Sequence, residues 1–173
     1  MNKFWVLLVV AIVFGCSSTP SIQEYYVSKT EDPSFLVLDI PTSILGITTS
    51  SLTEEEQDAL NSFQKFNVLL FRKTTSNAEQ LPQELSTVRS IIDSNSFDPL
   101  LVMSDRQYSG KLVLEGNLEN PDEIVFFGSS EGGFVLARLI GNEMQVEKAM
   151  LLANMIQREQ GLEKAAKAIG NML

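Results

Sequence analysis

Four short apolar segments in the second half of the chain restrict the fold most strongly. Each has the length and composition of a β-strand, and they lie at 100–103, 111–115, 123–127 and 134–140. The connections between them are short and carry turn residues such as Gly110, Gly116 and Pro121. Because a parallel crossover needs about a dozen residues or more, we expect these strands to be antiparallel neighbours.

The first half of the chain alternates strand and helix patterns. Strands are predicted at 35–38 and 68–71, and between them a helix starts after Thr53, where Glu56 completes a capping box. A second helix is predicted over 79–93, with a proline in its first turn. The apolar residues of its inner face are Leu81, Leu85, Val88 and Ile92.

A last helix is predicted to start after Asn142. Its inward-facing residues should be Val146, Ala149, Met150, Ala153, Met155 and Ile156. The element order predicts an α+β fold: a single, mostly antiparallel and possibly mixed sheet of about six strands, with helices packed on one face. The opening order of strand, helix, strand and helix leaves room for one parallel pair of strands.

The N-terminus has the layout of a bacterial lipoprotein signal. A basic start at 1–3 precedes an unbroken apolar run at 4–14, and Gly15 and Cys16 then complete a lipobox-like Val-Phe-Gly-Cys sequence. The apolar run covers about 16 Å as a helix, whereas the hydrocarbon core of a membrane is about 30 Å thick. We therefore expect a signal peptide that is cleaved between Gly15 and Cys16, rather than a membrane span.

Cys16 is the only cysteine, and the lipobox gives it a covalent role. A diacylglycerol on its thiol and an acyl chain on its new amine would anchor the protein stably, since one chain alone binds only marginally. The residues after Cys16 hold neither an aspartate at the next position nor a dense acidic run, so we expect an outer-membrane lipoprotein that faces the periplasm. The predicted organisation is a signal peptide at 1–15, a flexible tether at 16–33 and a single domain at 34–173.

Composition limits the chemistry that this chain can perform. It has no histidine, which excludes Ser-His-Asp and Cys-His catalysis within the chain as well as the usual zinc sites. Its net charge of -9 argues against nucleic acid as a partner, because binding to phosphates needs clustered Lys and Arg. We expect a protein that is not an enzyme and that carries no metal and no cofactor other than its lipid.

Several apolar segments together resemble a known family. They are the lipobox and the stretches at 36–41, 43–46, 123–127 and 134–142. This set resembles an uncharacterised family of Bacteroidetes envelope lipoproteins, the domain of unknown function 4252, over about 34–156. The resemblance implies an envelope lipoprotein near envelope-stress signalling. It implies no catalytic residues, because that family defines none.

Three polar segments could carry function, and each also has a plainer structural interpretation. The glycine-rich stretch 128–133 could cradle a phosphate, but it joins two strands, which favours an ordinary hairpin. The acidic run 54–56 could bind a cation, but successive helical residues point about 100° apart, which favours a first turn matched to the helix dipole. In 105–108, Arg106 and Tyr108 could contact a ligand, although an exposed loop is favoured.

Two further hypotheses concern residues far apart in the chain. Asp39 and Glu115 could form a carboxylate pair of the glycosidase type, which needs a separation of about 5–10 Å. The amphipathic stretch 162–173 follows Gly161 and could pack on the domain, which is favoured, or offer its apolar face to a partner.

The leading functional hypothesis is a lipid-anchored interaction or sensing module with an envelope protein as its partner. The alternative is a binder of small ligands, with a pocket lined by Phe126, Phe127 and Phe134. A hydrolase that uses carboxylates is the weakest alternative.

Overall fold

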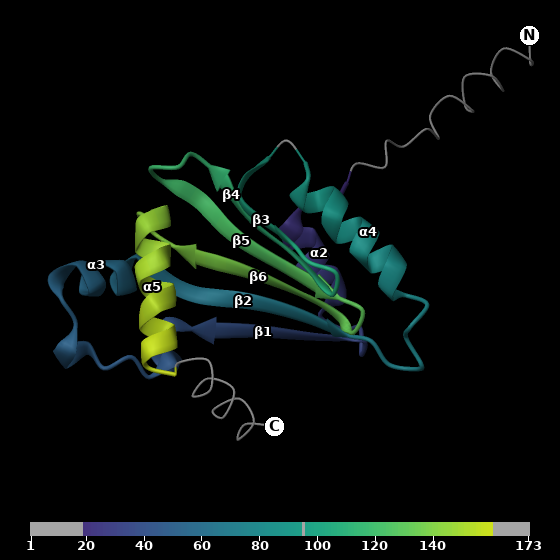
Figure 1. Cartoon of the computed structure of the whole chain (residues 1–173), viewed down its shortest axis with the longest axis horizontal. Coiled ribbons are helices and arrows are strands. Elements are labelled where there is room, and N and C mark those ends of the chain that lie inside the picture. The colour runs from purple at the N-terminus through teal and green to yellow at the C-terminus, as the bar shows by residue number, and fades with distance from the viewer. Residues whose placement is uncertain (1–18, 95, 161–173) are drawn as a thin grey trace, which may run out of the picture.

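A computed structural model describes residues 19–94 and 96–160, which contain one antiparallel sheet of six strands (Figure 1). The order of the strands in the sheet is β1-β2-β6-β5-β4-β3. Their bounds are β1 (Phe35–Pro41), β2 (Phe63–Arg72), β3 (Phe97–Ser104), β4 (Tyr108–Gly116), β5 (Pro121–Ser130) and β6 (Gly133–Gly141). The α+β class and the single sheet are confirmed, and every pair of neighbouring strands is antiparallel.

The helices of the described residues are α2 (Ile22–Lys29), α3 (Glu54–Ser62), α4 (Leu81–Ile92) and α5 (Val146–Arg158), with short 3₁₀ turns at Thr42–Leu45 and Thr49–Ser51. Helices α3 and α4 lie close to where the sequence places them, α5 starts at Val146 with Gln145 as its N-cap rather than directly after Asn142, and α2 was not predicted. The predicted capping box at the start of α3 is present: the side chain of Thr53 accepts from the N–H of Glu56, and the side chain of Glu56 accepts from the N–H of Thr53. Pro82 lies in the first turn of α4.

The helices lie on both faces of the sheet, not on one face as the element order suggested (Figure 1). Successive strand residues point to opposite faces, and Val125 and Ile124 belong to two separate apolar clusters. The first face, which includes Val125, is covered by α2 and α4. The second face, which includes Ile124, is covered by α5, and α3 packs against α5 at one end of the sheet. The strands are apolar on both sides, so one layer of helices could not bury them.

Helix α2 differs from the flexible tether predicted at 16–33. Its side chains Ile22, Tyr25 and Tyr26 are buried in the core of the first face. The hydroxyl of Tyr26 lies 2.6 Å from the carbonyl oxygen of Leu136 and 3.0 Å from that of Asn67, so it ties the helix to β6 and β2. A Ser-Thr-Glu-rich composition predicted a tether, but two tyrosines with hydrogen-bond partners and one isoleucine supply enough apolar surface to fold this segment onto the sheet.

Helix α5 covers only one end of the second face. Its side chains Leu152 and Met155 are buried, whereas its Met150, which the helical pattern placed inward, is mostly exposed. In Figure 1, α5 crosses the strands near the end where β6 terminates, and no helix of the described residues lies over the opposite ends on that side. No helix among the described residues is long and apolar enough to span a membrane. The signal peptide, Cys16 and the predicted amphipathic stretch 162–173 lie outside the described residues.

Candidate functional site

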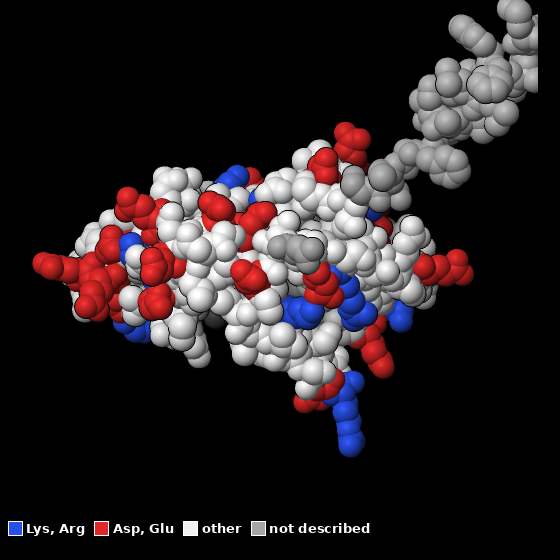
Figure 2. Space-filling model, turned by 90° about the horizontal axis from the view of Figure 1, so that it is seen from above, with Lys and Arg blue, Asp and Glu red and all other residues white. Residues whose placement is uncertain are grey.

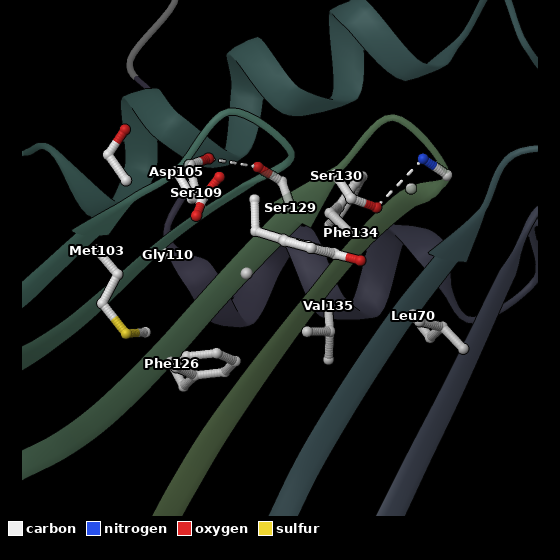
Figure 3. Close-up of a pocket in the computed structure, with 15 residues that line it drawn as sticks. Leu70, Met103, Asp105, Ser109, Gly110, Phe126, Ser129, Ser130, Phe134 and Val135 are labelled. Atoms are coloured by element: carbon white, nitrogen blue, oxygen red, sulfur yellow. Dashed lines mark hydrogen bonds between the residues drawn. The ribbon is translucent and has the colours of Figure 1, made fainter.

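The half of the second face that no helix of residues 19–94 and 96–160 covers forms an open groove of about 610 Å³ (Figure 3). Its floor consists of Leu70 on β2, Val135 on β6 and Phe126 on β5. Met103 on β3 and Tyr108 on β4 complete its apolar lining near the sheet edge. We call this surface the open groove. Apolar residues of the strands point to both faces, and among the described residues α5 covers only one end of the second face.

A pair of glycines makes the open groove deeper. Gly110 on β4 and Gly128 on β5 are direct cross-strand partners on the second face. A Cβ atom added at Gly128 would lie 3.1 Å from the ring of Phe126, and one at Gly110 would lie 3.2 Å from the Sδ-bound methyl carbon of Met103. The two glycines therefore provide the room in which the Phe126 ring and the end of Met103 lie against the sheet. The strand patterns did not reveal this feature, although both glycines are visible in the sequence.

Polar groups gather at the end of the open groove where two hairpins turn. The hydroxyl of Ser130 accepts from the N–H of Gly132 at 3.2 Å (Figure 3). The hydroxyls of Ser109 and Ser129, 2.8 Å apart, lie on the first face, because these residues are in register with Phe134 of the first-face core. The glycine-rich stretch 128–133 thus forms the β5–β6 hairpin, as favoured. No Lys or Arg side chain is among the described residues that line the groove, and Asp105 is its one charged residue. This chemistry fits an uncharged, largely apolar ligand.

The tip of the β3–β4 hairpin brings part of the predicted 105–108 loop to the open groove. Asp105 and Tyr108 line it, whereas Arg106 lines a separate hollow on the other side of the hairpin tip, which it shares with Lys73 and Arg89. The two residues proposed to contact a ligand therefore share this hollow, and only Tyr108 of the two also lines the open groove. Tyr108 borders both sites.

A second, smaller cavity of about 260 Å³ lies between α5 and the sheet. All of its described lining residues are hydrophobic: Phe66, Leu100, Leu112, Ile124, Phe126, Ala137, Leu139, Val146, Ala149, Met150, Leu152, Ala153 and Ile156. Phe126 is the wall that this cavity shares with the open groove. Cavities with such linings stay dry and accept apolar molecules.

The three phenylalanines predicted to line one pocket do not share one. Phe126 lies between the groove and the α5 cavity. Phe127 belongs to the core of the first face. Phe134 also belongs to that core, where its ring stacks on Phe71 with centroids 5.6 Å apart, and it borders the groove at the start of β6.

A buried polar network lies on the first face, beneath α2. The guanidinium of Arg138 on β6 donates through Nε and Nη2 to the two carboxylate oxygens of Glu123 on β5. Gln23 of α2 donates to the same carboxylate at 3.2 Å, and the Arg138 charge lies 5.4 Å from the ring centroid of Tyr26. Because each charge is buried and paired, this cluster holds α2 in place, and its donors and acceptors are occupied.

The carboxylate pair proposed from the sequence is not formed. Asp39 lies on β1, where it accepts from Lys65 and Asn67, while Glu115 lies on β4. These strands are four positions apart in the sheet, which corresponds to about 19 Å at ~4.8 Å per strand. Glu115 instead has Glu123 as its cross-strand partner. Burial, followed by the charge of Glu123, raises the pKa of Glu115 above its ordinary value.

The acidic run at the start of α3 serves the helix, as favoured. Glu56 caps α3 and also accepts from Arg158 of α5 at 2.8 Å, which keeps the pKa of Glu56 below its ordinary value. Acidic side chains are dense over the end of the molecule that carries α3, at the left of Figure 2. Among the described residues, no three acidic, histidine or cysteine side chains come together in a way that could hold a metal ion.

These features define a small α+β domain whose described part presents apolar surface and brings no proposed catalytic pair together. The chain belongs to the family described as a domain of unknown function (DUF4252), whose model matches residues 25–152. That match starts within α2 and ends within α5, so it covers the whole sheet. Neither a comparison with curated proteins nor one with solved structures gives a match.

Proposed function

We propose that this protein is a lipid-anchored, non-enzymatic interaction module of the bacterial envelope, and that the open groove is its binding surface. The observation that carries the proposal is the uncovered apolar half of the second face, where Leu70, Phe126 and Met103 line a groove of about 610 Å³. Contiguous exposed apolar surface of this kind is typical of interaction sites. The partner that fits it is an envelope protein with an uncharged, apolar segment, and envelope-stress signalling is the pathway in which we expect to find it.

Two features of the sequence support this proposal. The lipobox around Cys16 supplies the anchor, with an outer-membrane location facing the periplasm as the expected site. The lack of histidine removes the commonest general base, which favours binding over catalysis.

Cross-linking in intact cells, followed by mass spectrometry, tests the proposal. Leu70→Glu places a charge on the groove floor, and Val27→Glu places the same charge at an exposed valine of α2, outside the groove. We expect a specific partner that cross-links to the wild type and to Val27→Glu, is lost with Leu70→Glu, and is lost or reduced with the unlipidated Cys16→Ser. Val135→Lys gives an independent second charge in the groove.

The control for these variants is their fold, which far-ultraviolet circular dichroism and thermal unfolding check. If folded Leu70→Glu and Val135→Lys keep the same cross-linked partner as Val27→Glu, the groove is not the binding surface. If Cys16→Ser stays in the membrane fraction as the wild type does, and the wild type carries no added lipid mass, the lipid anchor is wrong.

A second candidate function is binding of a small apolar ligand in the cavity beneath α5. The specific observation that favours it is the wholly hydrophobic lining of that cavity. Native mass spectrometry of the protein purified from its membrane should then show a bound apolar molecule. Ala153→Phe, which fills the cavity, should abolish that binding. An unliganded wild type would leave interaction with a protein as the proposal.

A further inference from the structure

Helix α5 ends in a turn of the chain on the second face of the sheet. Gln160 follows Glu159, the C-cap of α5, and has a positive φ of 53°. A left-handed residue at this position ends a helix and turns the chain away from the helix axis. Arg158, in the last turn of α5, donates to Glu56 of α3 at 2.8 Å. Because α5 crosses the strands from β6 toward β1 (Figure 1), the described chain makes this turn on the β1 side of the second face.

Beyond α5, the floor of the open groove continues across the sheet as one apolar row. Its members are successive cross-strand partners on the second face: Leu36 of β1, Leu70 of β2, Val135 of β6, Gly128 of β5 and Gly110 of β4. Leu36 and Leu70 are 41% and 39% exposed, so the apolar surface reaches the β1 edge. No helix of the described residues lies over this row, and none of its members carries a charge.

The sequence that follows Gln160 carries an apolar stripe. With ~100° between successive helical residues, six apolar residues of 162–173 fall within an arc about 120° wide. They are Leu162, Ala165, Ala166, Ile169, Met172 and Leu173. The charged residues Glu163, Lys164 and Lys167 all fall in the opposite half. A helix of this sequence would therefore meet an uncharged row without burying a charge.

The dimensions of the second face match a second helix beside α5. The apolar row lies four residues along the strands from Phe66 and Leu139, which pack in the cluster under α5. This separation is about 13 Å, which leaves room for a helix whose axis lies 8–10 Å from that of α5. Twelve helical residues span about 18 Å, and the four strand spacings from β1 to β4 span about 19 Å. Gly161 supplies a flexible residue between the two helices.

We propose that residues 162–173 form a helix that runs back antiparallel to α5 and lies on the open groove as a cover within the same molecule. At 1.5 Å per residue, the small Ala165 and Ala166 come over Leu70 of β2. The larger Leu173 comes over the glycine pair, where the absence of side chains leaves the most space above the sheet. The stripe and the row are thus complementary in size as well as in polarity.

The cover gives the open groove a regulated state, a consequence that rests on the groove being the binding surface proposed above. A segment attached to the same chain acts at a high effective concentration, so a partner must displace it before it can bind. The partner segment that fits is an amphipathic helix with small residues in the middle of its apolar stripe. Binding would then release residues 162–173 from the groove.

Disulfide trapping tests the cover in the purified full chain. With Cys16→Ser the chain has no other thiol, and a disulfide requires Cα atoms within about 7 Å. Leu70→Cys combined with Ala166→Cys should form a disulfide within one molecule on mild oxidation. The matched control is Leu70→Cys combined with Lys167→Cys, one residue further along but on the charged side. We expect the first pair to be trapped at least about tenfold faster, because only a docked helix holds one side of the segment against Leu70.

A charge on the stripe should open the cover. Ile169→Glu should raise the uncovered fraction at least about tenfold, since a buried isoleucine contributes more than that factor. Binding of a fluorescent apolar dye measures this fraction, and Lys167→Glu, with its charge on the other side of the segment, should behave as the wild type does. In the cross-linking experiment described above, Ile169→Glu should capture more of the partner than Lys167→Glu.

Two results would overturn the cover. One is equal trapping of the two double-cysteine variants, which is expected of a tail that does not dock. The other is a disulfide that forms only between molecules, which would assign the groove to the segment of a second copy. Trapping and dye binding need no partner protein, so they separate the cover from the proposed function. If Ala166→Cys is trapped selectively while folded Leu70→Glu keeps its partner, the cover stands and the proposed binding surface is wrong.

Discussion

Replacing Arg138 by methionine should destabilise the protein strongly, because it leaves the buried carboxylate of Glu123 without its counter-ion. The side chains of Arg138 and Glu123 are 11% and 5% exposed. Arg138 supplies two donors to that carboxylate and a third, at 3.5 Å, to Asn67. Breaking a buried ion pair from one side typically costs about 3–5 kcal/mol. At roughly 2–4 °C per kcal/mol for a chain of this size, we expect the Tm to fall by about 6–20 °C.

Thermal unfolding at pH 7, followed by circular dichroism, measures this fall. The matched control is Lys65→Met, which breaks an exposed pair with Asp39 and should cost at most about 1 kcal/mol. Replacing both partners, with Arg138→Met and Glu123→Leu together, should recover most of the loss, since no buried charge is then left unpaired. The reasoning is refuted if Arg138→Met unfolds within the range of Lys65→Met, or if the double variant is less stable than the single one.

Three further predictions follow from the core and its charges. The raised pKa of Glu115 means that the folded state holds the carboxyl proton more tightly than the unfolded state, so this group disfavours folding as pH rises above the unfolded pKa near 4.5. Glu115→Gln should therefore raise the Tm at pH 7 and leave the Tm unchanged at pH 3. A gain in Tm that is equal at both pH values would contradict this. In urea unfolding, the stability lost on replacing a glycine by alanine should follow the space around that glycine. Gly132→Ala, whose Cβ would lie 3.6 Å from the nearest atom, should be almost neutral, Gly128→Ala should cost about 1–3 kcal/mol, and Gly133→Ala, whose Cβ would lie 2.0 Å from the Phe71 carbonyl oxygen, should not fold stably. A reversed order would show that the strands move apart freely. Thr53→Ala removes the cap of α3 and should cost about 1 kcal/mol in the same assay, whereas Thr87→Ala, in the middle of α4, should cost less.

Local sequence patterns predicted most elements but not how they stack. The capping box at Thr53 and Glu56 fixed the start of α3, because the interactions involved lie within four residues. The short connections before β4 and after Gly116 predicted the antiparallel hairpins for the same reason, although Gly110, expected in a turn, lies within β4. The two layers of helices were missed, because apolar runs such as 123–127 show that a strand is buried without showing how many helices cover it.

The candidate site depended on contacts that no local pattern contains. The open groove results from the length of α5 relative to the sheet, and from a cross-strand pairing of Gly110 with Gly128 that only the register reveals. Helix α2 was mistaken for a linker because its stability comes from Tyr26 reaching carbonyl groups of β2 and β6, far away in the sequence. The network of Glu123 and Arg138 was missed for the same reason, since its two strands had to be aligned first.

The docking of α2 on the first face has a consequence for how the molecule is held at a bilayer. With the proposed lipid on Cys16, five residue steps separate the anchor from Ser21, the N-cap of α2, a reach of at most ~17 Å for a fully extended chain. Helix α2, to which this short segment leads, lies on the side of the sheet that α2 and α4 cover. The open groove lies on the opposite side, with the sheet between it and α2. In a molecule anchored in this way, the first face of the sheet lies toward the lipid headgroups and the open groove faces away from them. The groove is then presented to soluble or membrane-spanning proteins that approach from the aqueous compartment.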